Sequence, residues 1–178
     1  MTTLCKWYVG IALFFAMILD GSLALAFQKV FYHPNWGAAC WFTVVGICLI
    51  ALFDDLNKNN IWLVLGIGIL ADSYYFGYFG IYTVAFPLVY FILQKLTRFL
   101  PETLWFRLII CLLAYLFVSL YVFLIYAIIG TQQIGFETFL LSILPSWLVC
   151  VIIFFITYAF WKNLIEKYPF LESQRTYL

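Results

Sequence analysis

The sequence predicts an all-α integral membrane protein: a single transmembrane domain, residues 1–178, folded as a compact bundle of six transmembrane helices. Two observations on composition predict this class. Apolar residues make up 67% of the 178 residues and charged residues only 10%, whereas a soluble domain is about half apolar and about a quarter charged. So few charged side chains cannot cover a surface in water, which excludes soluble, disordered and nucleic-acid-binding proteins.

The third observation is a series of apolar segments, most of them close to the ~20 residues that a helix needs to cross a bilayer. They cover residues 7–27, 37–53, 61–78, 79–94, 105–129 and 138–161. The first segment is longer than the ~7–15 apolar residues of a cleaved signal peptide and contains Asp20. We therefore expect it to remain attached as the first span.

Short polar or charged segments separate most of these spans. The breaks read KVFYHPNWG after the first span, DDLNKNN after the second, KLTRFLPET after the fourth and GTQQIGFE after the fifth. The third and fourth spans are short and are joined by the aromatic turn SYYFGYFG, so they either cross fully or form a shallower hairpin. In the last span, Pro145 is expected to bend or locally open the helix and free a backbone carbonyl.

The distribution of basic residues predicts the orientation. If the six spans alternate from a cytoplasmic N-terminus, only Lys29 lies outside, and the inside holds Lys6, Lys58, Lys95, Arg98, Arg107, Lys162, Lys167 and Arg175. Short loops rich in Lys and Arg stay in the cytoplasm, and tryptophan is enriched at membrane interfaces. Both termini are therefore predicted to be cytoplasmic, with Trp7 and Trp62 at the inner interface.

No residue pattern predicts a catalytic site, a cofactor or a metal. The five cysteines are scattered singly, without a C-x-x-C or a nearby histidine, and are expected to be small buried residues within the helices. The only histidine, His33, lies beside Pro34 in YHPNWG, where a loop role is expected. The serines within the spans have no histidine there, and no glycine-rich phosphate loop is present. The sequence thus predicts a protein that is not an enzyme.

Two acids, Asp20 and Asp72, lie within apolar spans, in the half nearer the outer side. A carboxylate at the centre of a membrane helix costs about 2.5–3.5 kcal/mol on insertion scales, so each should have a local reason. One interpretation is a proton or cation relay, or a site for a substrate. The interpretation that we favour is structural: hydrogen-bonded acids that lock helices together, with Asp72 capping the turn that follows it.

Small residues indicate where helices approach closely. The first span contains Ala12-x-x-x-Ala16, and the third contains a strip of Gly66, Gly68 and Ala71. Such pairs favour packing seams, either inside the bundle or against the helix of another protein. Because no loop exceeds about a dozen residues, we expect the lateral surface to bind partners, with Ala12 and Ala16 forming a shallow groove. The candidates for helix packing or partner contact are Ala12, Ala16, Asp20, Gly66, Asp72, Gly77, Gly80 and Pro145.

Three segments together resemble the rod shape-determining protein MreD family. The first span, with Asp20-Gly21 near its outer end, resembles the opening helix of that family. The stretch GIGILADSYYFGYFGIYTVAFPLVYFILQKL is similar to the family's most recognisable segment, through the residues Gly66, Asp72, Gly80 and Tyr82.

The last span also resembles the family's terminal helix, with its proline at Pro145 and a basic cytoplasmic end. It departs from the family in one respect. Members often carry an asparagine a few residues after the proline, where this sequence has Trp147 to Cys150. The resemblance covers the whole chain.

The resemblance implies a non-enzymatic scaffold of the bacterial cell-wall elongation machinery, in the cytoplasmic membrane. Members bind the single-pass membrane protein MreC, and through it work with the actin-like MreB, the glycan polymerase RodA and a penicillin-binding transpeptidase. No cofactor and no nucleic acid is implied. In physical terms, a bundle without large loops acts by holding a partner's transmembrane helix against its side.

A second interpretation is the vitamin-binding S subunit of an energy-coupling-factor transporter. That family is also a compact six-helix bundle of similar size, and Ala12-x-x-x-Ala16 is similar to the motif by which such subunits dock on their coupling protein. The outer half, however, contains few convergent polar groups for a vitamin. The candidates are Asp20, Asp72, Gln132, Gln133 and Glu137.

Overall fold

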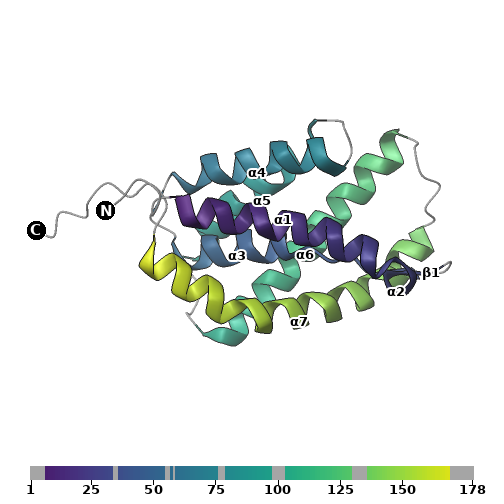
Figure 1. The fold of residues 1–178 in the computed structure, drawn as a ribbon. Helices are drawn as coiled ribbons and strands as arrows, with labels where there is room; N and C mark the ends of the chain where they lie inside the picture. The colour runs from purple at the N-terminus through teal and green to yellow at the C-terminus, as the bar shows by residue number, and fades with distance from the viewer. Residues whose placement is uncertain are drawn as a thin grey trace, which may run out of the picture.

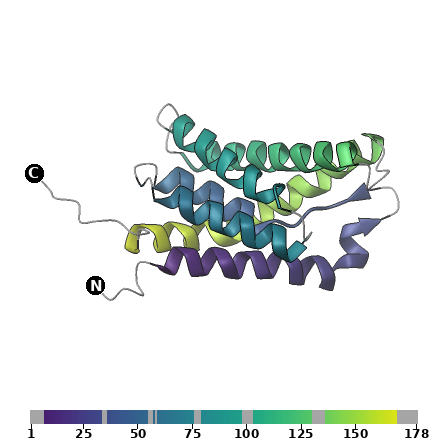
Figure 2. The ribbon, with the colours of Figure 1, turned by 90° about the horizontal axis from the view of Figure 1, so that it is seen from above.

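Six helices of 12 to 32 residues form the bundle. The computed structural model of the chain describes residues 7–33, 36–54, 57, 59–75, 79–97, 103–129 and 136–168. Within them, the long helices are α1 (Tyr8–Ala26), α3 (Phe42–Phe53), α4 (Asn60–Tyr75), α5 (Tyr82–Thr97), α6 (Leu104–Ile129) and α7 (Phe136–Lys167). Each corresponds to one predicted apolar segment. In Figures 1 and 2 the helices lie side by side, and α1 begins at the end of the bundle where α7 ends.

The connection from α1 to α3 contains the remaining regular structure. A four-residue helix, α2 (Gln28–Phe31), leads into β1 (Tyr32–His33), which pairs antiparallel with β2 (Trp36–Gly37). Tyr32 is opposite Gly37, and His33 is opposite Trp36. This two-residue ladder was not expected from the sequence, and it leaves the fold essentially all-helical.

Helix α3 is the central helix. Every residue from Thr43 to Leu52 is buried, because α1, α5, α6 and α7 all pack against it. The uniformly apolar sequence of α3 therefore reflects burial within protein.

The outer helices, in contrast, expose apolar side chains. Leu25 of α1, Ile128 of α6 and Leu144 of α7 are 73%, 80% and 71% exposed. Among the described residues, these same three helices are long and apolar enough to cross a membrane. A helix that is apolar on its inner and outer faces alike suits a lipid environment. The helices and their surface thus indicate a membrane protein.

Two predicted boundaries differ from the structure. The second segment was predicted to begin at residue 37, but α3 begins at Phe42, because side chains of other helices bind the backbone of the preceding residues (described below). The last helix extends beyond 138–161 at both ends and continues through Pro145 without interruption. The described cysteines, Cys40, Cys48, Cys111 and Cys150, are free and buried, and all but Cys40, which precedes α3, lie within helices as predicted; Cys5 lies outside the described residues.

Glycine in α3 allows three helices to meet, which leads to a first prediction. A Cβ atom on Gly46 would lie 2.6 Å from the indole of Trp161 in α7 and 3.0 Å from Leu13 in α1. Both neighbours are buried, so neither can move aside cheaply. We expect Gly46→Ala to lower the free energy of unfolding by about 1–3 kcal/mol through overpacking.

The matched control is Gly66→Ala in α4, where an added Cβ meets no atom within 4 Å. There the better helix propensity of alanine should be neutral or stabilising, by up to ~1 kcal/mol. Thermal unfolding of the two purified variants in detergent gives the comparison. An equal or higher midpoint for Gly46→Ala would contradict the packing described here.

Candidate functional site

The carboxylate of Asp72, near the end of α4, holds the beginning of α5. Asp72 is fully buried. It accepts hydrogen bonds from the backbone N–H groups of Gly80 (2.8 Å), Tyr82 (2.6 Å) and Thr83 (3.0 Å), and from the Thr83 hydroxyl (2.7 Å). The first N–H groups of a helix have no partner within the helix, so Asp72 supplies what α5 lacks. The predicted role of Asp72 as the cap of this turn is confirmed.

Two glycines make this arrangement possible. Gly80 has a φ of +120°, a conformation that side chains disfavour. A Cβ atom on Gly68 would lie 2.8 Å from the Cα of Thr83 and from the carbonyl oxygen of Tyr82. Gly68 therefore lets α5 lie directly against α4, within reach of the Asp72 carboxylate. Gly77, another candidate in this turn, lies outside the described residues.

Asp20 performs the same function for α3. Its carboxylate, buried near the end of α1, accepts bonds from the N–H of Phe42, from the N–H of Thr43 (3.0 Å) and from the Thr43 hydroxyl (2.6 Å). The same arrangement thus occurs at two places in the bundle. In each, an aspartate near the end of one helix caps the next long helix, and a threonine in the first turn of that helix donates its hydroxyl to the aspartate. In both caps the oxygens are occupied by donors of the chain itself, which favours the structural interpretation over a relay or a substrate site.

The alanines predicted to form an outward groove lie mainly inside the bundle. Ala16 is buried, and Ala12 is partly buried against the core. On α4, the strip of small residues faces two ways. Gly68 and Ala71 are buried, whereas Gly66 faces open space. On this strip, Gly66 is thus the small residue that remains open to a partner.

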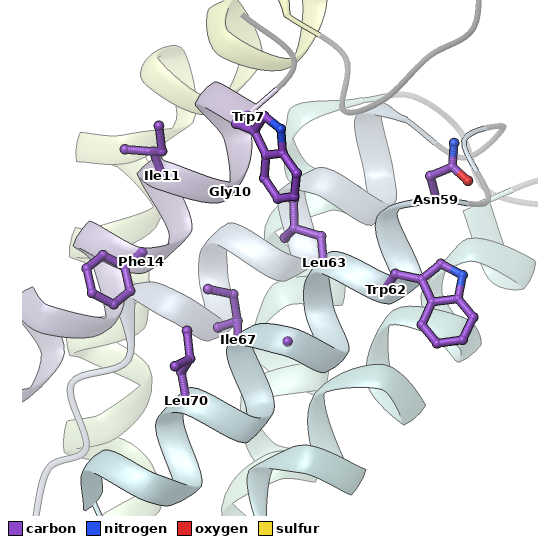
Figure 3. Close-up of a pocket in the computed structure, with 10 residues that line it drawn as sticks. Trp7, Gly10, Ile11, Phe14, Asn59, Trp62, Leu63, Ile67 and Leu70 are labelled. Carbon is purple, nitrogen blue, oxygen red and sulfur yellow. The ribbon is translucent and has the colours of Figure 1, made fainter. Parts of the chain in front are cut away.

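An apolar groove of about 490 Å³ runs between α1 and α4 (Figure 3). Besides Asn59, its lining residues are Trp7, Gly10, Ile11 and Phe14 from the α1 side and Trp62, Leu63, Gly66, Ile67 and Leu70 from α4. In the figure, Ile11 and Phe14 lie on one side, and Leu63, Ile67 and Leu70 on the other. We call this feature the α1–α4 groove.

Its two glycines help to keep the groove open. A Cβ atom on Gly66 would meet nothing within 4 Å, and one on Gly10 would only touch Leu63 at 3.4 Å. Trp7 and Trp62, at one end, are 52% and 71% exposed. The groove therefore combines accessible backbone, apolar walls and amphipathic aromatic residues at one end.

Sequence reasoning missed the segment that precedes α3. Gly37 donates its N–H to the Ser142 hydroxyl (2.9 Å), and Ala39 donates its N–H to the Ser146 hydroxyl (3.1 Å). The hydroxyl of Tyr115 donates to the Ala39 carbonyl. These bonds replace those of a helix, which explains why α3 starts late. The only available signal was the spacing of Ser142 and Ser146, four residues apart on one face of the last span.

A sequence model of the family described as rod shape-determining protein MreD matches residues 1–161 of the chain. The match covers well over half of the 178 residues. The chain belongs to the rod shape-determining protein MreD family. No curated protein matches it, and no solved structure does.

The resemblance inferred from the sequence is thereby confirmed. MreD membership places the chain in a family of rod shape determination. The matched range includes both aspartate caps and the whole α1–α4 groove, and it ends within α7. The features described above thus lie in the part of the chain that defines the family.

The Asp72 cap leads to a second prediction. Asp72→Leu leaves four donors without their acceptor, and a buried donor left unpaired, such as the Tyr82 N–H, costs about 1–3 kcal/mol. Asp72→Asn keeps one acceptor oxygen but replaces the other with an amide N–H₂, which cannot accept a hydrogen bond. Its loss of stability should therefore lie between those of the Leu variant and the wild type. Thr83→Val, which removes only the hydroxyl donor, should cost least. Thermal midpoints in detergent give the order; a Leu variant as stable as the wild type would exclude the cap.

Proposed function

We propose that this MreD-family protein is a non-enzymatic scaffold of the cell-wall elongation machinery in the bacterial cytoplasmic membrane, and that it binds the transmembrane helix of MreC in the α1–α4 groove. The observation that carries the proposal is the open position of Gly66 on an otherwise apolar, outward-facing groove. Contacts with MreB, RodA and a penicillin-binding transpeptidase are then indirect, through MreC.

The chemistry of the groove suits a helix. In lipid there is little hydrophobic drive for helices to associate, so they pair through close packing at small residues. Gly66 and Gly10 allow the backbone of a second helix to approach, and Phe14, Ile67 and Leu70 supply apolar walls. Trp7 and Trp62 at one end suit the membrane interface, where tryptophan is favoured.

The transporter interpretation receives less support. A vitamin site would need polar groups that are free to bind a ligand, but the oxygens of Asp20 and Asp72 are occupied by backbone and threonine donors. Near the Asp20 cap, Trp41 packs against the rings of Tyr82 and Tyr115, at centroid distances of 6.4 and 5.0 Å. Aromatic side chains therefore fill this part of the outer half.

The proposal includes the topology: one domain of six spans, with both termini cytoplasmic. In support, α1 begins and α7 ends at the same end of the bundle (Figure 1), and Trp7 and Asn59, at the starts of α1 and α4, line one groove. The shorter helices α4 and α5 contribute to the bilayer-embedded bundle as a hairpin closed by the Asp72 cap.

Filling the groove should prevent partner binding. We expect Gly66→Leu to reduce co-purification of MreC by about tenfold or more, which corresponds to ~1.4 kcal/mol of lost contact. The fold should be kept, because the added side chain meets no atom near its Cβ. The measurement is the amount of MreC captured from detergent extracts, together with the monodispersity of the variant.

The matched control is Ala127→Leu, which enlarges an exposed small residue on α6. Capture that is unchanged in a well-folded Gly66→Leu variant would move the contact to another face. Ala16→Leu should instead lower stability, since Ala16 is buried, and it separates damage to the bundle from damage to the groove.

Cysteine labelling tests the topology. In a Cys5→Ser background, an impermeant thiol reagent applied to whole cells should react with a cysteine introduced at the exposed Lys29 and not with one at Thr97, because the basic residues lie on the cytoplasmic side. The buried native cysteines are not expected to react. Labelling of position 97 without position 29 would reverse the orientation.

A further inference from the structure

Arg107, near the beginning of α6, is fixed between two other helices. Its guanidinium lies over the ring of Phe53 at the end of α3, 4.1 Å from the ring centroid. One of its nitrogens, Nη1, donates a hydrogen bond to the hydroxyl of Tyr158 in α7, at 3.0 Å. The side chain is partly buried. Its planar head is therefore held in one orientation before any ligand arrives.

Most of the hydrogen-bonding capacity of Arg107 is unused. A guanidinium has five N–H donors, and within the described part of the chain Arg107 donates only to Tyr158. The acid next to Phe53, Asp54, instead accepts a bond from the amide of Asn60 at 3.0 Å. Glu102 lies outside the described residues. A partly buried cation with free donors calls for an anionic acceptor.

The surroundings add positive charge. Lys162 is exposed on α7, one helical turn beyond Tyr158 and on the same face. The N-terminal end of α6, which begins at Leu104 three residues before Arg107, carries the positive end of the helix dipole. Glu166, also exposed, follows Lys162 by a further turn.

An exposed apolar side chain lies deeper on the same face of α7. Phe155 is 52% exposed. It precedes Tyr158 by three residues, so it lies next to Tyr158 on one face of α7 and farther from the end of the bundle where α7 ends. An amphipathic molecule could place its anionic group near Arg107 and a chain along Phe155.

We propose that Arg107, Tyr158 and Lys162 bind the phosphate of an anionic phospholipid. The fork of the guanidinium fits two phosphate oxygens, Lys162 adds a second cation, and an acyl chain covers Phe155. Basic sites between helices at a membrane interface bind lipid headgroups in this way. Inorganic phosphate offers the same oxygens but has no chains. This lipid site is on α6 and α7, away from the α1–α4 groove, and does not depend on MreC binding.

The test is native mass spectrometry of the full-length protein in mixed micelles of phosphatidylglycerol and phosphatidylcholine. We expect the wild type to retain phosphatidylglycerol several-fold over phosphatidylcholine. Lys162→Gln should lower this preference about fivefold, the effect of one basic residue at an anionic membrane surface. Arg107→Lys, which keeps the charge but loses the fork, should lower it at least as much.

The control is Lys95→Gln on α5, which removes a lysine that lies over Phe91, 4.4 Å from its centroid; it should leave the preference unchanged. Four results would overturn the proposal. Three concern the lipid preference: no preference in the wild type, full preference in a folded Lys162→Gln variant, or an equal loss in Lys95→Gln, which would indicate general surface charge. The fourth is a thermal midpoint raised by inorganic phosphate as much as by phosphatidylglycerol, which would exclude a lipid as the ligand.

Discussion

The structure depends on how backbone N–H groups are satisfied where helices begin inside a largely apolar bundle. Helix α3 begins after a non-helical segment, and α5 begins after a turn, so each start leaves backbone N–H donors without a partner in the helix. Asp20 and Asp72 accept these donors. Because each aspartate belongs to the preceding long helix, the caps also fix the pairs α1–α3 and α4–α5. Gly68 permits the close contact that the second cap requires. Asp20 and Asp72 could have formed a proton relay or a substrate site of a transporter, but their contacts are more simply explained as helix caps of the fold.

Much of the fold could be predicted because membrane helices follow from length and apolarity alone. Six apolar segments became six helices, and a single aspartate just before an aromatic turn was enough to predict the Asp72 cap. The failures have a common physical cause. In lipid both faces of a helix are apolar, so periodicity does not separate inward from outward residues. Gly66 and Gly68 looked like one strip but face open space and α5 respectively. Residues 37–41 were predicted to be helical because they are apolar. Their backbone instead binds two serines that lie about 105 residues away in sequence, which no pattern within residues 37–41 indicates.

The same constraint limits what the protein can do. With the buried aspartates engaged in caps, the two binding features that we propose are lateral: the groove between α1 and α4, and the basic site on α6 and α7. Membership of the MreD family gives the first feature a biological context in shape determination. The proposed scaffold role requires a rigid bundle, since a partner helix is positioned only as well as the surface that holds it. The caps and the packing around Gly46 supply that rigidity at the centre, and the groove between α1 and α4 remains open to a partner.

The central claim is that the α1–α4 groove holds the MreC helix, and site-specific photo-crosslinking in native membranes tests it most directly. A photoreactive residue at position 66 lies in the groove, whereas one at the exposed position 127 on α6 points away from the core on another helix. We expect a crosslink to MreC from position 66 and none from position 127. A crosslink from position 127 together with none from position 66 would contradict it.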